Sequence, residues 1–144
     1  MKPIYIKQYW KGVFSYLDGY ETINQYKEVS FSMEITINDN SFIGTSTDSE
    51  SKDVFDKPAI VKGFIDDDKM SFIVKYPCAY FKDEDGKIVI DKSLEHPDIH
   101  YLGIFDDNKK NVDGNWEMTI YEEKYGDDYL SEILNGEFQM KRMN

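Results

Sequence analysis

Hydrophobic and polar residues alternate strictly from Val29 to Asn38, where every second side chain is apolar. A period of two is typical of a β-strand that buries one face and exposes the other. Asn38-Asp39-Asn40 follows, and Asn and Asp readily adopt the backbone conformations of a tight turn. A second run of this kind, Ser41–Thr47, begins directly after the turn. The two runs are therefore predicted to form an antiparallel hairpin.

Similar runs recur along the chain, separated by short segments rich in Asp, Asn and Gly. Further strands are predicted within Ile4–Tyr20, Pro58–Ile65, Met70–Tyr76, Ala79–Phe81, Lys87–Ile90, Ile99–Phe105, Val112–Tyr121 and Gly136–Arg142. Short strands at regular spacing with turn residues between them indicate an antiparallel meander.

One segment departs from the alternating pattern. Asp127–Leu134 places its apolar residues at helical spacing, with Asp127 as a candidate N-cap and Asn135-Gly136 as a stop. We therefore predict one short helix directly before the last strand.

A sheet of this many strands has two edge strands unless it closes on itself. An open meander leaves two unpaired edges, which are templates for aggregation, and closing the sheet removes both. We predict an all-β protein with a single domain over residues 1–144. Its fold is a single antiparallel up-and-down β-barrel of about eight or nine strands, with the short helix before the last strand. A barrel of this size holds packed side chains or one small ligand.

Composition excludes several classes of partner. The 144 residues include 11 Tyr and 9 Phe, which suit a pleated sheet, and their formal net charge is −11. An excess of carboxylates disfavours nucleic acid and anionic lipid, which bind through clustered Lys and Arg. The chain has no apolar stretch of membrane-spanning length and no apolar N-terminal run typical of a signal peptide. We therefore expect no nucleic acid, no membrane and a cytoplasmic location.

Glycines near aromatic residues recur along the predicted strands. The instances are Phe42-x-Gly44, Gly63, Phe72-x-x-x-Tyr76, Tyr101-x-Gly103 and Gly114-x-Trp116. Gly permits the coiling that barrel strands need, and a neighbouring ring covers the bare backbone. Over residues 4–142 this pattern resembles the calycin barrels, the superfamily of lipocalins and avidins. The resemblance implies a barrel that binds a small apolar or amphipathic ligand in its interior.

The two ends of the chain carry a second point of similarity. Lipocalins close one end of the barrel with a first-strand Trp that is packed by an Arg from the final segment. Trp10 and Arg142, the only arginine in the chain, match this arrangement. The resemblance implies that the guanidinium stacks on the indole and closes the barrel, a favourable cation–π geometry. The alternative is a solvated basic residue on the last strand.

Alternating apolar residues in Val112–Ile120 form a stripe that marks the candidate interior of the barrel. If Val112–Ile120 turns every second side chain inward, residues of neighbouring strands can join it. The candidate ligand-binding residues are Met33, Tyr76, Tyr101, Trp116 and Met118. Aromatic and Met side chains line apolar pockets, yet they also fill small barrels. The stripe does not distinguish an open interior from a filled one.

The two histidines, His96 and His100, are weak candidates for a metal site. Pro97 and the strand pattern that follows favour an extended segment, in which residues four apart lie more than about 12 Å from each other. A shared metal would need the loop to bend back, with Glu95 and Asp98 as further ligands. We expect neither a metal nor a cofactor.

No catalytic motif is present in the sequence. The acidic turn that begins at Asp83 fails the calcium-loop pattern because Lys87 occupies the position of the third donor. Cys78, the only cysteine, cannot form an internal disulfide and is interpreted as a small filler residue. The chain has no phosphate-binding glycine loop, no Gly-x-Ser-x-Gly and no dinucleotide fingerprint. An enzyme is therefore not supported.

Two hypotheses for the function remain. The first is a lipocalin-like barrel that binds a small apolar or amphipathic ligand. The second is an acidic protein-binding or inhibitor module, of the immunity type, with a filled barrel and a basic protein partner. An open interior would favour the first, and acidic turns clustered beside exposed Tyr would favour the second.

Overall fold

A computed structural model gives the fold and describes residues 5–16, 28–52, 55–82, 85, 88–125 and 128–143. These residues form ten β-strands: β1 (Tyr5–Tyr16), β2 (Glu28–Asn38), β3 (Ser41–Asp48), β4 (Ala59–Asp66), β5 (Lys69–Lys75), β6 (Ala79–Lys82), β7 (Ile88–Asp91), β8 (Ile99–Phe105), β9 (Asn111–Tyr125) and β10 (Asp128–Arg142). None of the described residues belongs to a helix long and apolar enough to cross a membrane.

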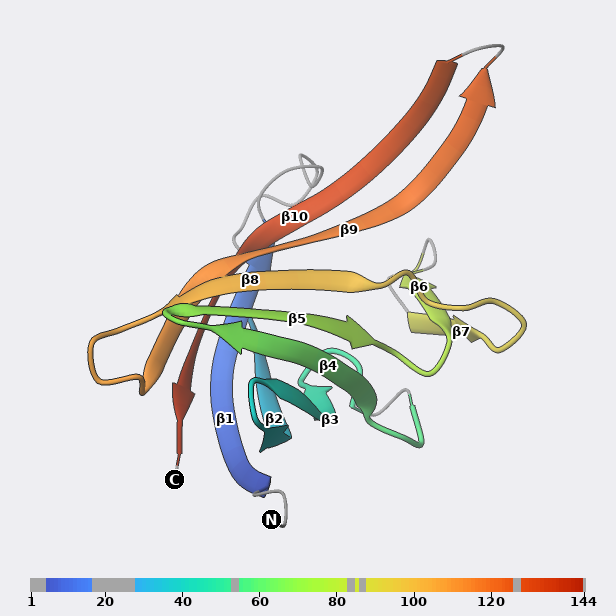
Figure 1. The fold of residues 1–144 in the computed structure, drawn as a ribbon. Coiled ribbons are helices and arrows are strands. Elements are labelled where there is room, and N and C mark those ends of the chain that lie inside the picture. Colours follow the sequence, from blue (N-terminus) through green and yellow to red (C-terminus); the bar gives the residue numbers. More distant parts are fainter. Residues whose placement is uncertain are drawn as a thin grey trace.

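Eight of the strands close into a barrel in the order β1-β10-β9-β8-β5-β4-β3-β2. Every neighbouring pair is antiparallel, and β1 closes the barrel by pairing with β10. The meander is interrupted once, because β6 and β7 form a separate two-stranded sheet between β5 and β8 (Figure 1). The predicted closed, antiparallel up-and-down barrel is confirmed.

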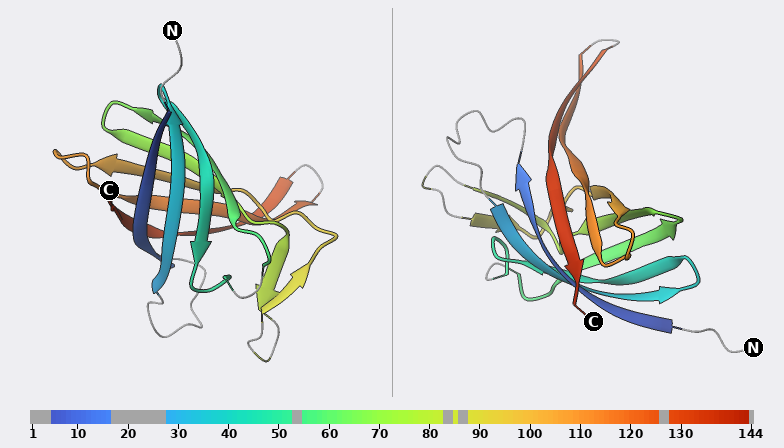
Figure 2. Two further views of the ribbon diagram at one scale, coloured as in Figure 1. Left: turned by 90° about the horizontal axis from the view of Figure 1, so that it is seen from below. Right: turned by 90° about the vertical axis from the view of Figure 1, so that its left-hand side faces the viewer.

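The predicted short helix is wrong. The described part of that segment, from Asp128, belongs to β10, a 15-residue strand that pairs with β9. Together they form a ribbon that projects beyond the barrel (Figure 1), and Figure 2 shows it from two further sides. The error has a simple cause: a separation of four positions is close to one helical turn but is also an even number, so it suits a strand equally well.

Gly136, which was expected to stop the helix, has a different role within β10. A Cβ atom at this position would lie 1.7 Å from the Ser15 carbonyl oxygen and 2.5 Å from Trp116 Nε1. Glycine is required here because β10 passes this close to its neighbours.

The inward side chains of the barrel strands form one core. Its buried members are Trp10, Phe14, Val29, Phe31, Met33, Ile35, Ile37, Phe42, Ala59, Val61, Met70, Phe72, Val74, Tyr76, Ile99, Tyr101, Val112, Trp116, Phe138 and Met140. Near its centre, the ring of Phe72 stacks on Tyr101 with centroids 4.8 Å apart, and Phe138 meets both rings edge-on. Aromatic side chains therefore fill much of the interior.

The turns β2–β3, β4–β5 and β8–β9 meet at one end of the barrel, called the closed end below. There the Ile65 N–H donates to the Asn40 carbonyl at 2.7 Å, and the Phe105 N–H donates to the Asp68 carbonyl at 2.8 Å. The other end, called the mouth, carries the β3–β4 loop, the β6–β7 hairpin and the start of β8.

Trp10 and Arg142 lie directly opposite each other at the closed end. They are Cα partners in the β1–β10 ladder, and the Trp10 ring packs 6.2 Å from that of Phe105. The Arg142 Nε atom is buried and has no hydrogen-bond partner within the described part of the chain. This register places the two residues as the predicted closure requires, while stacking of the guanidinium on the indole stays a prediction.

Candidate functional site

The predicted interior residues are all at least partly buried, four of them on strands and Tyr76 directly after β5. Met33, Tyr76 and Tyr101 line one internal cavity of about 10 Å³. Trp116 is buried, and its Nε1 donates to the Ser15 carbonyl at 3.0 Å. Met118 is partly buried against the core. A cavity of this size has room for about one water molecule, so packed side chains occupy the interior.

A buried carboxylate lies where this cavity approaches the mouth. Asp48 ends β3 and is only 4% exposed. Its Oδ1 accepts hydrogen bonds from the backbone N–H groups of Glu50 and Ser51, at 3.0 and 2.8 Å. Its Oδ2 accepts one from the Ser51 hydroxyl at 2.9 Å and one from the Tyr76 hydroxyl. All four donors are neutral, and within the described residues Asp48 forms no ion pair.

Two further titratable side chains lie close to Asp48. His96 is 5% exposed, and its ring meets that of Tyr76 edge-on with centroids 4.9 Å apart. Burial lowers the pKa of His96, while the nearby Pro97 carbonyl and the Asp48 charge oppose this shift. Burial, together with the charge of Asp48, raises the pKa of Tyr101. Both shifts favour the neutral forms of His96 and Tyr101 beside Asp48.

An open cleft adjoins this polar group at the mouth. Its volume is about 190 Å³, and its lining consists of Ser46, Thr47, Ser51, Lys52, Phe55, Asp56, Lys57, Pro58, Ala59 and Tyr76. Phe55 stacks on Tyr76 with centroids 5.8 Å apart. Ser46 and Tyr76 also line the internal cavity, so these two side chains separate the cleft from the barrel interior.

The histidines do not share a site. His96 is buried at the mouth, whereas His100 lies on β8 with its side chain exposed on the outer wall. Glu95 and Asp98, the expected additional ligands, form ion pairs with Lys75 instead. The Lys75 Nζ atom lies 3.5 Å from Glu95 Oε2 and 3.8 Å from Asp98 Oδ1. In the part of the chain that the structure describes, no group of three or more His, Cys, Asp or Glu side chains is placed to hold a metal ion. Cys78 is buried.

Acidic turns gather at the closed end. The acidic residues are Asp39, Asp66, Asp67, Asp68, Asp106 and Asp107, and the basic residues at this end are Lys69, Lys109, Lys110, Lys141 and Arg142. Tyr5, in the register position opposite Asn38, is 62% exposed beside them. The basic protein partner stays a prediction.

Sequence reasoning missed Asp48 and Ser51. A signal for Asp48 was present, because the inward alternation of β3 continues from Phe42 through Gly44 and Ser46 to Asp48. An acidic residue at the inward end of a strand needs hydrogen-bond donors, and the Ser-rich segment after it could have supplied them. Ser51 and His96 come from loops, and no sequence period predicts where a loop side chain points.

Comparisons with known proteins found few matches. No protein-family model matches the sequence, and no curated protein matches it. Among solved structures, the crystal structure of rhizavidin is similar over 93% of this chain and 84% of that one, with 11% sequence identity and a TM-score of 0.45. Similarity at this level assigns no residue of this chain a role.

Proposed function

We propose that this protein binds a small amphipathic molecule at the mouth of the barrel, in the cleft beneath the β3–β4 loop. The observation that supports the proposal is the buried carboxylate of Asp48, which lies behind one wall of that cleft and is held by neutral donors. Burying a carboxylate without a cationic partner is costly, so such a group marks a position where a bound ligand can add favourable interactions.

The hydroxyl groups on the cleft wall define the ligand chemistry. The hydrogen of Ser51 Oγ is directed to Asp48 Oδ2, so the lone pairs of Ser51 Oγ remain to accept a hydrogen bond. Asp48 places a carboxyl group behind this wall, while Lys52, Asp56 and Lys57 line the rest of the cleft. The matching ligand group is an N–H donor, best of all an ammonium group.

The rest of the cleft favours an apolar body. Phe55, Pro58 and Ala59 contribute apolar surface, while Lys52, Asp56 and Lys57 supply charged groups at the rim. The volume of about 190 Å³ is smaller than the 300–1,000 Å³ of typical drug-sized pockets, so the ligand is expected to be a compact amine.

The mouth is a better location than the interior first predicted for the ligand. The internal cavity of about 10 Å³ cannot take an organic molecule unless packed rings move. Tyr76 lies between the two sites because it lines both the internal cavity and the cleft at the mouth. Met33 and Tyr101 would then support the site from behind.

A matched pair of probes tests this proposal. Benzylamine carries an ammonium group and benzyl alcohol is its neutral counterpart of similar size. We expect benzylamine to bind about tenfold more tightly in an NMR titration, the effect of one added charge-assisted hydrogen bond. Asp48→Asn should abolish this preference, whereas Asp56→Asn, which alters an exposed carboxylate on the same cleft, should preserve most of it.

Equal binding of the two probes to the unaltered protein would contradict the proposal, as would a preference that survives Asp48→Asn. Asp48 also holds the β3–β4 loop, so the fold of the variant must be verified by near-UV circular dichroism. Ser51→Ala is a milder second variant, because it removes the hydroxyl acceptor and leaves both backbone donors of Asp48 in place.

A further inference from the structure

The β9–β10 ribbon has an unpaired strand edge. β8 pairs with β9 only as far as Glu117, the partner of His100, whereas β9 continues to Tyr125. Beyond Glu117, β9 keeps β10 as its neighbour on one side, and no strand in the described part of the chain pairs with it on the other. Figure 1 shows the two strands leaving the barrel side by side. Unpaired N–H and C=O groups along such an edge are a template for another strand.

A shift of register within the ribbon marks a β-bulge. In the described register, β9 holds one residue, Ile120, without a partner on β10. A bulge bends the strand and increases its twist, which accounts for the way the ribbon leaves the barrel. From Tyr121 to Tyr125 the register with β10 is regular again. This part of β9 therefore offers five consecutive residues of regular strand edge, which is the length of a typical strand.

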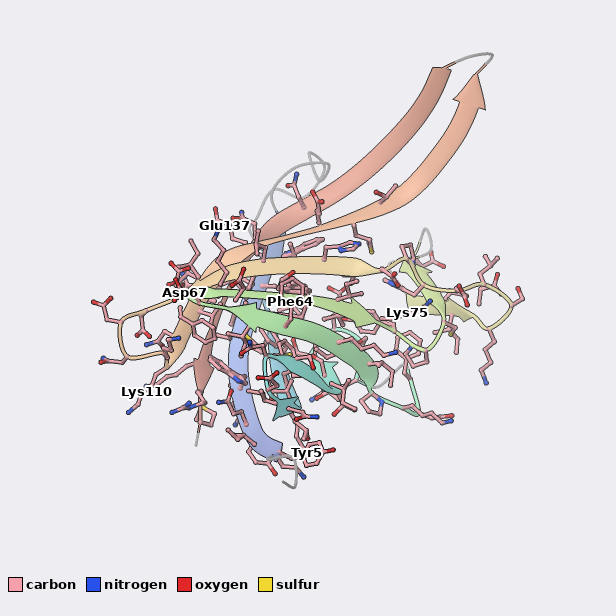
Figure 3. All side chains as sticks on the ribbon, in the orientation of Figure 1. Tyr5, Phe64, Asp67, Lys75, Lys110 and Glu137 are labelled. Atoms are coloured by element: carbon pink, nitrogen blue, oxygen red, sulfur yellow. The ribbon has the colours of Figure 1, made fainter. Side chains whose placement is uncertain are left out.

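The segment before β8 lies away from this edge. Pro97 lacks the N–H group that a paired strand donates. Lys75, at the end of β5 (Figure 3), forms ion pairs with Glu95 and Asp98. His96, between these two acidic residues, is buried at the mouth. The chain that leads into β8 therefore contacts β5 and the mouth rather than the ribbon, which leaves the edge of β9 open.

Negative charge is concentrated in the same ribbon. Its 17 residues, 117–125 and 128–135, include five acidic residues and one lysine, so they carry −4 of the formal net charge of −11. The charged residues are Glu117, Glu122, Glu123, Lys124, Asp128 and Glu132. Residues 91–98, which lead into β8, include three acidic residues and one lysine, so they add no positive charge. A strand added at this edge is therefore favoured by positive charge and disfavoured by negative charge.

We propose that the edge of β9 from Tyr121 to Tyr125 binds an extended basic peptide segment, which adds to the ribbon as a third strand. Main-chain hydrogen bonds supply the affinity of such strand addition, and Lys or Arg side chains of the peptide supply the preference for this edge. A third strand also stabilises the ribbon, because two strands alone are marginally stable in water. Charge disfavours a second copy as the occupant, since two ribbons of formal charge −4 repel each other.

Fluorescence anisotropy with a designed peptide tests the proposal on the full chain. The probe is a labelled peptide of about eight residues that alternates Lys and Val, and its counterpart alternates Glu and Val. We expect saturable binding of the Lys peptide that weakens at least about tenfold between about 50 and about 300 mM NaCl. The Glu peptide should not bind. Absence of saturable binding of the Lys peptide would overturn the proposal, as would equal binding of the two peptides.

Methylation of the peptide backbone separates strand addition from charge attraction alone. A Lys peptide in which every backbone nitrogen is methylated keeps its charge but has no N–H donors. We expect its affinity to be at least about 20-fold lower, because the hydrogen bonds of an added strand no longer form. Equal affinity of the methylated and unmethylated peptides would overturn the proposal.

A matched pair of charge variants tests the location of the peptide. Glu122→Gln with Glu123→Gln removes two charges from the ribbon and should weaken binding of the Lys peptide about fivefold or more. Asp66→Asn with Asp67→Asn removes two charges at the closed end and should change the affinity by less than about twofold. A larger effect of the closed-end variant would place the peptide elsewhere and overturn the proposal.

Amide chemical shifts of the unaltered protein give a reading that does not depend on the fold of any variant. The Lys peptide should perturb the amides of Tyr121–Tyr125 most, and perturbations confined to other strands would contradict the proposal. Asp48→Asn should leave the affinity for the peptide unchanged, because Asp48 lies behind the cleft at the mouth. Loss of peptide binding in Asp48→Asn would assign the peptide to the mouth and overturn strand addition. The cleft and the ribbon edge are thus tested separately.

Discussion

Asp48 and His96 show how burial acts differently on two titratable residues at the mouth. Both side chains are no more than 5% exposed. Asp48 accepts four hydrogen bonds, whereas the His96 ring packs against Tyr76 and has its Nδ1 2.8 Å from the Pro97 carbonyl. Burial favours the neutral imidazole of His96.

This difference predicts a pH dependence of stability. Burial lowers the pKa of His96 below its ordinary value of 6.5, so the unfolded chain binds a proton at a higher pH than the folded chain. The free energy of unfolding should therefore be insensitive to His96 above about pH 7 and should fall as the pH drops below about 6.5. Urea denaturation between pH 5.5 and 7.5 measures this trend.

His96→Gln should flatten the profile over this pH range, because it removes the titrating group. His100→Gln is the control, since the side chain of His100 is exposed on the outer wall. A His96→Gln profile that runs parallel to that of the unaltered protein would rule out His96 as the cause.

At the scale of elements, the β1–β10 pair joins the two ends of the chain. Its register runs from Trp10 opposite Arg142 to Tyr16 opposite Gly136. The pairing crosses more than a hundred residues of sequence, so its closure is entropically costly and depends on well-packed contacts. Trp10 supplies part of this packing, being 1% exposed at the closed end.

Arg142→Ala should lower the melting temperature by about 3–6 °C. The expected loss is about 1–1.5 kcal/mol, from a partly desolvated guanidinium on the indole and from its packing. Arg142→Lys should recover only part of this loss because an ammonium group lacks the planar stacking surface. Lys141→Ala, at the adjacent exposed position, should change the melting temperature little. An unchanged melting temperature for Arg142→Ala would eliminate the predicted stack.

At the scale of the whole molecule, the β6–β7 hairpin is not part of the barrel sheet. Its strands have four residues each and pair only with one another in the sheet order. A lone two-stranded sheet is marginally stable in water, whereas every barrel strand has a partner on both sides. The two parts should therefore open independently.

Amide hydrogen exchange tests this difference. Hydrogen-bonded amides of β6 and β7 should exchange at least about 100-fold faster than those of the β4–β5 hairpin, because local opening costs far less than opening the barrel. Mass spectrometry of peptides from the two hairpins makes the comparison within one sample. Equal protection would show that β6–β7 opens only when the barrel unfolds.

The alternating pattern was sufficient for most of the strands and for barrel closure. Val29–Asn38 corresponds to β2 within one residue, and the Asn38-Asp39-Asn40 turn places Asp39 in the left-handed region at a φ of 62°. A strand and a tight turn depend on residues that are close in sequence, so the local pattern of residues predicts them. The segment before Gly136 was misread because its spacing fits both helix and strand.

The alternating pattern alone specified most of the strands, the face on which each of their side chains lies and the need to close the sheet. Tertiary structure decided whether the interior is open, because rings from strands far apart in sequence, such as Phe72 and Phe138, meet only in the closed barrel. It also decided the candidate site, since Asp48, Ser51 and Tyr76 come together from one strand end and two loops. Local periodicity specifies which face a residue occupies, whereas packing across the barrel specifies what that residue touches.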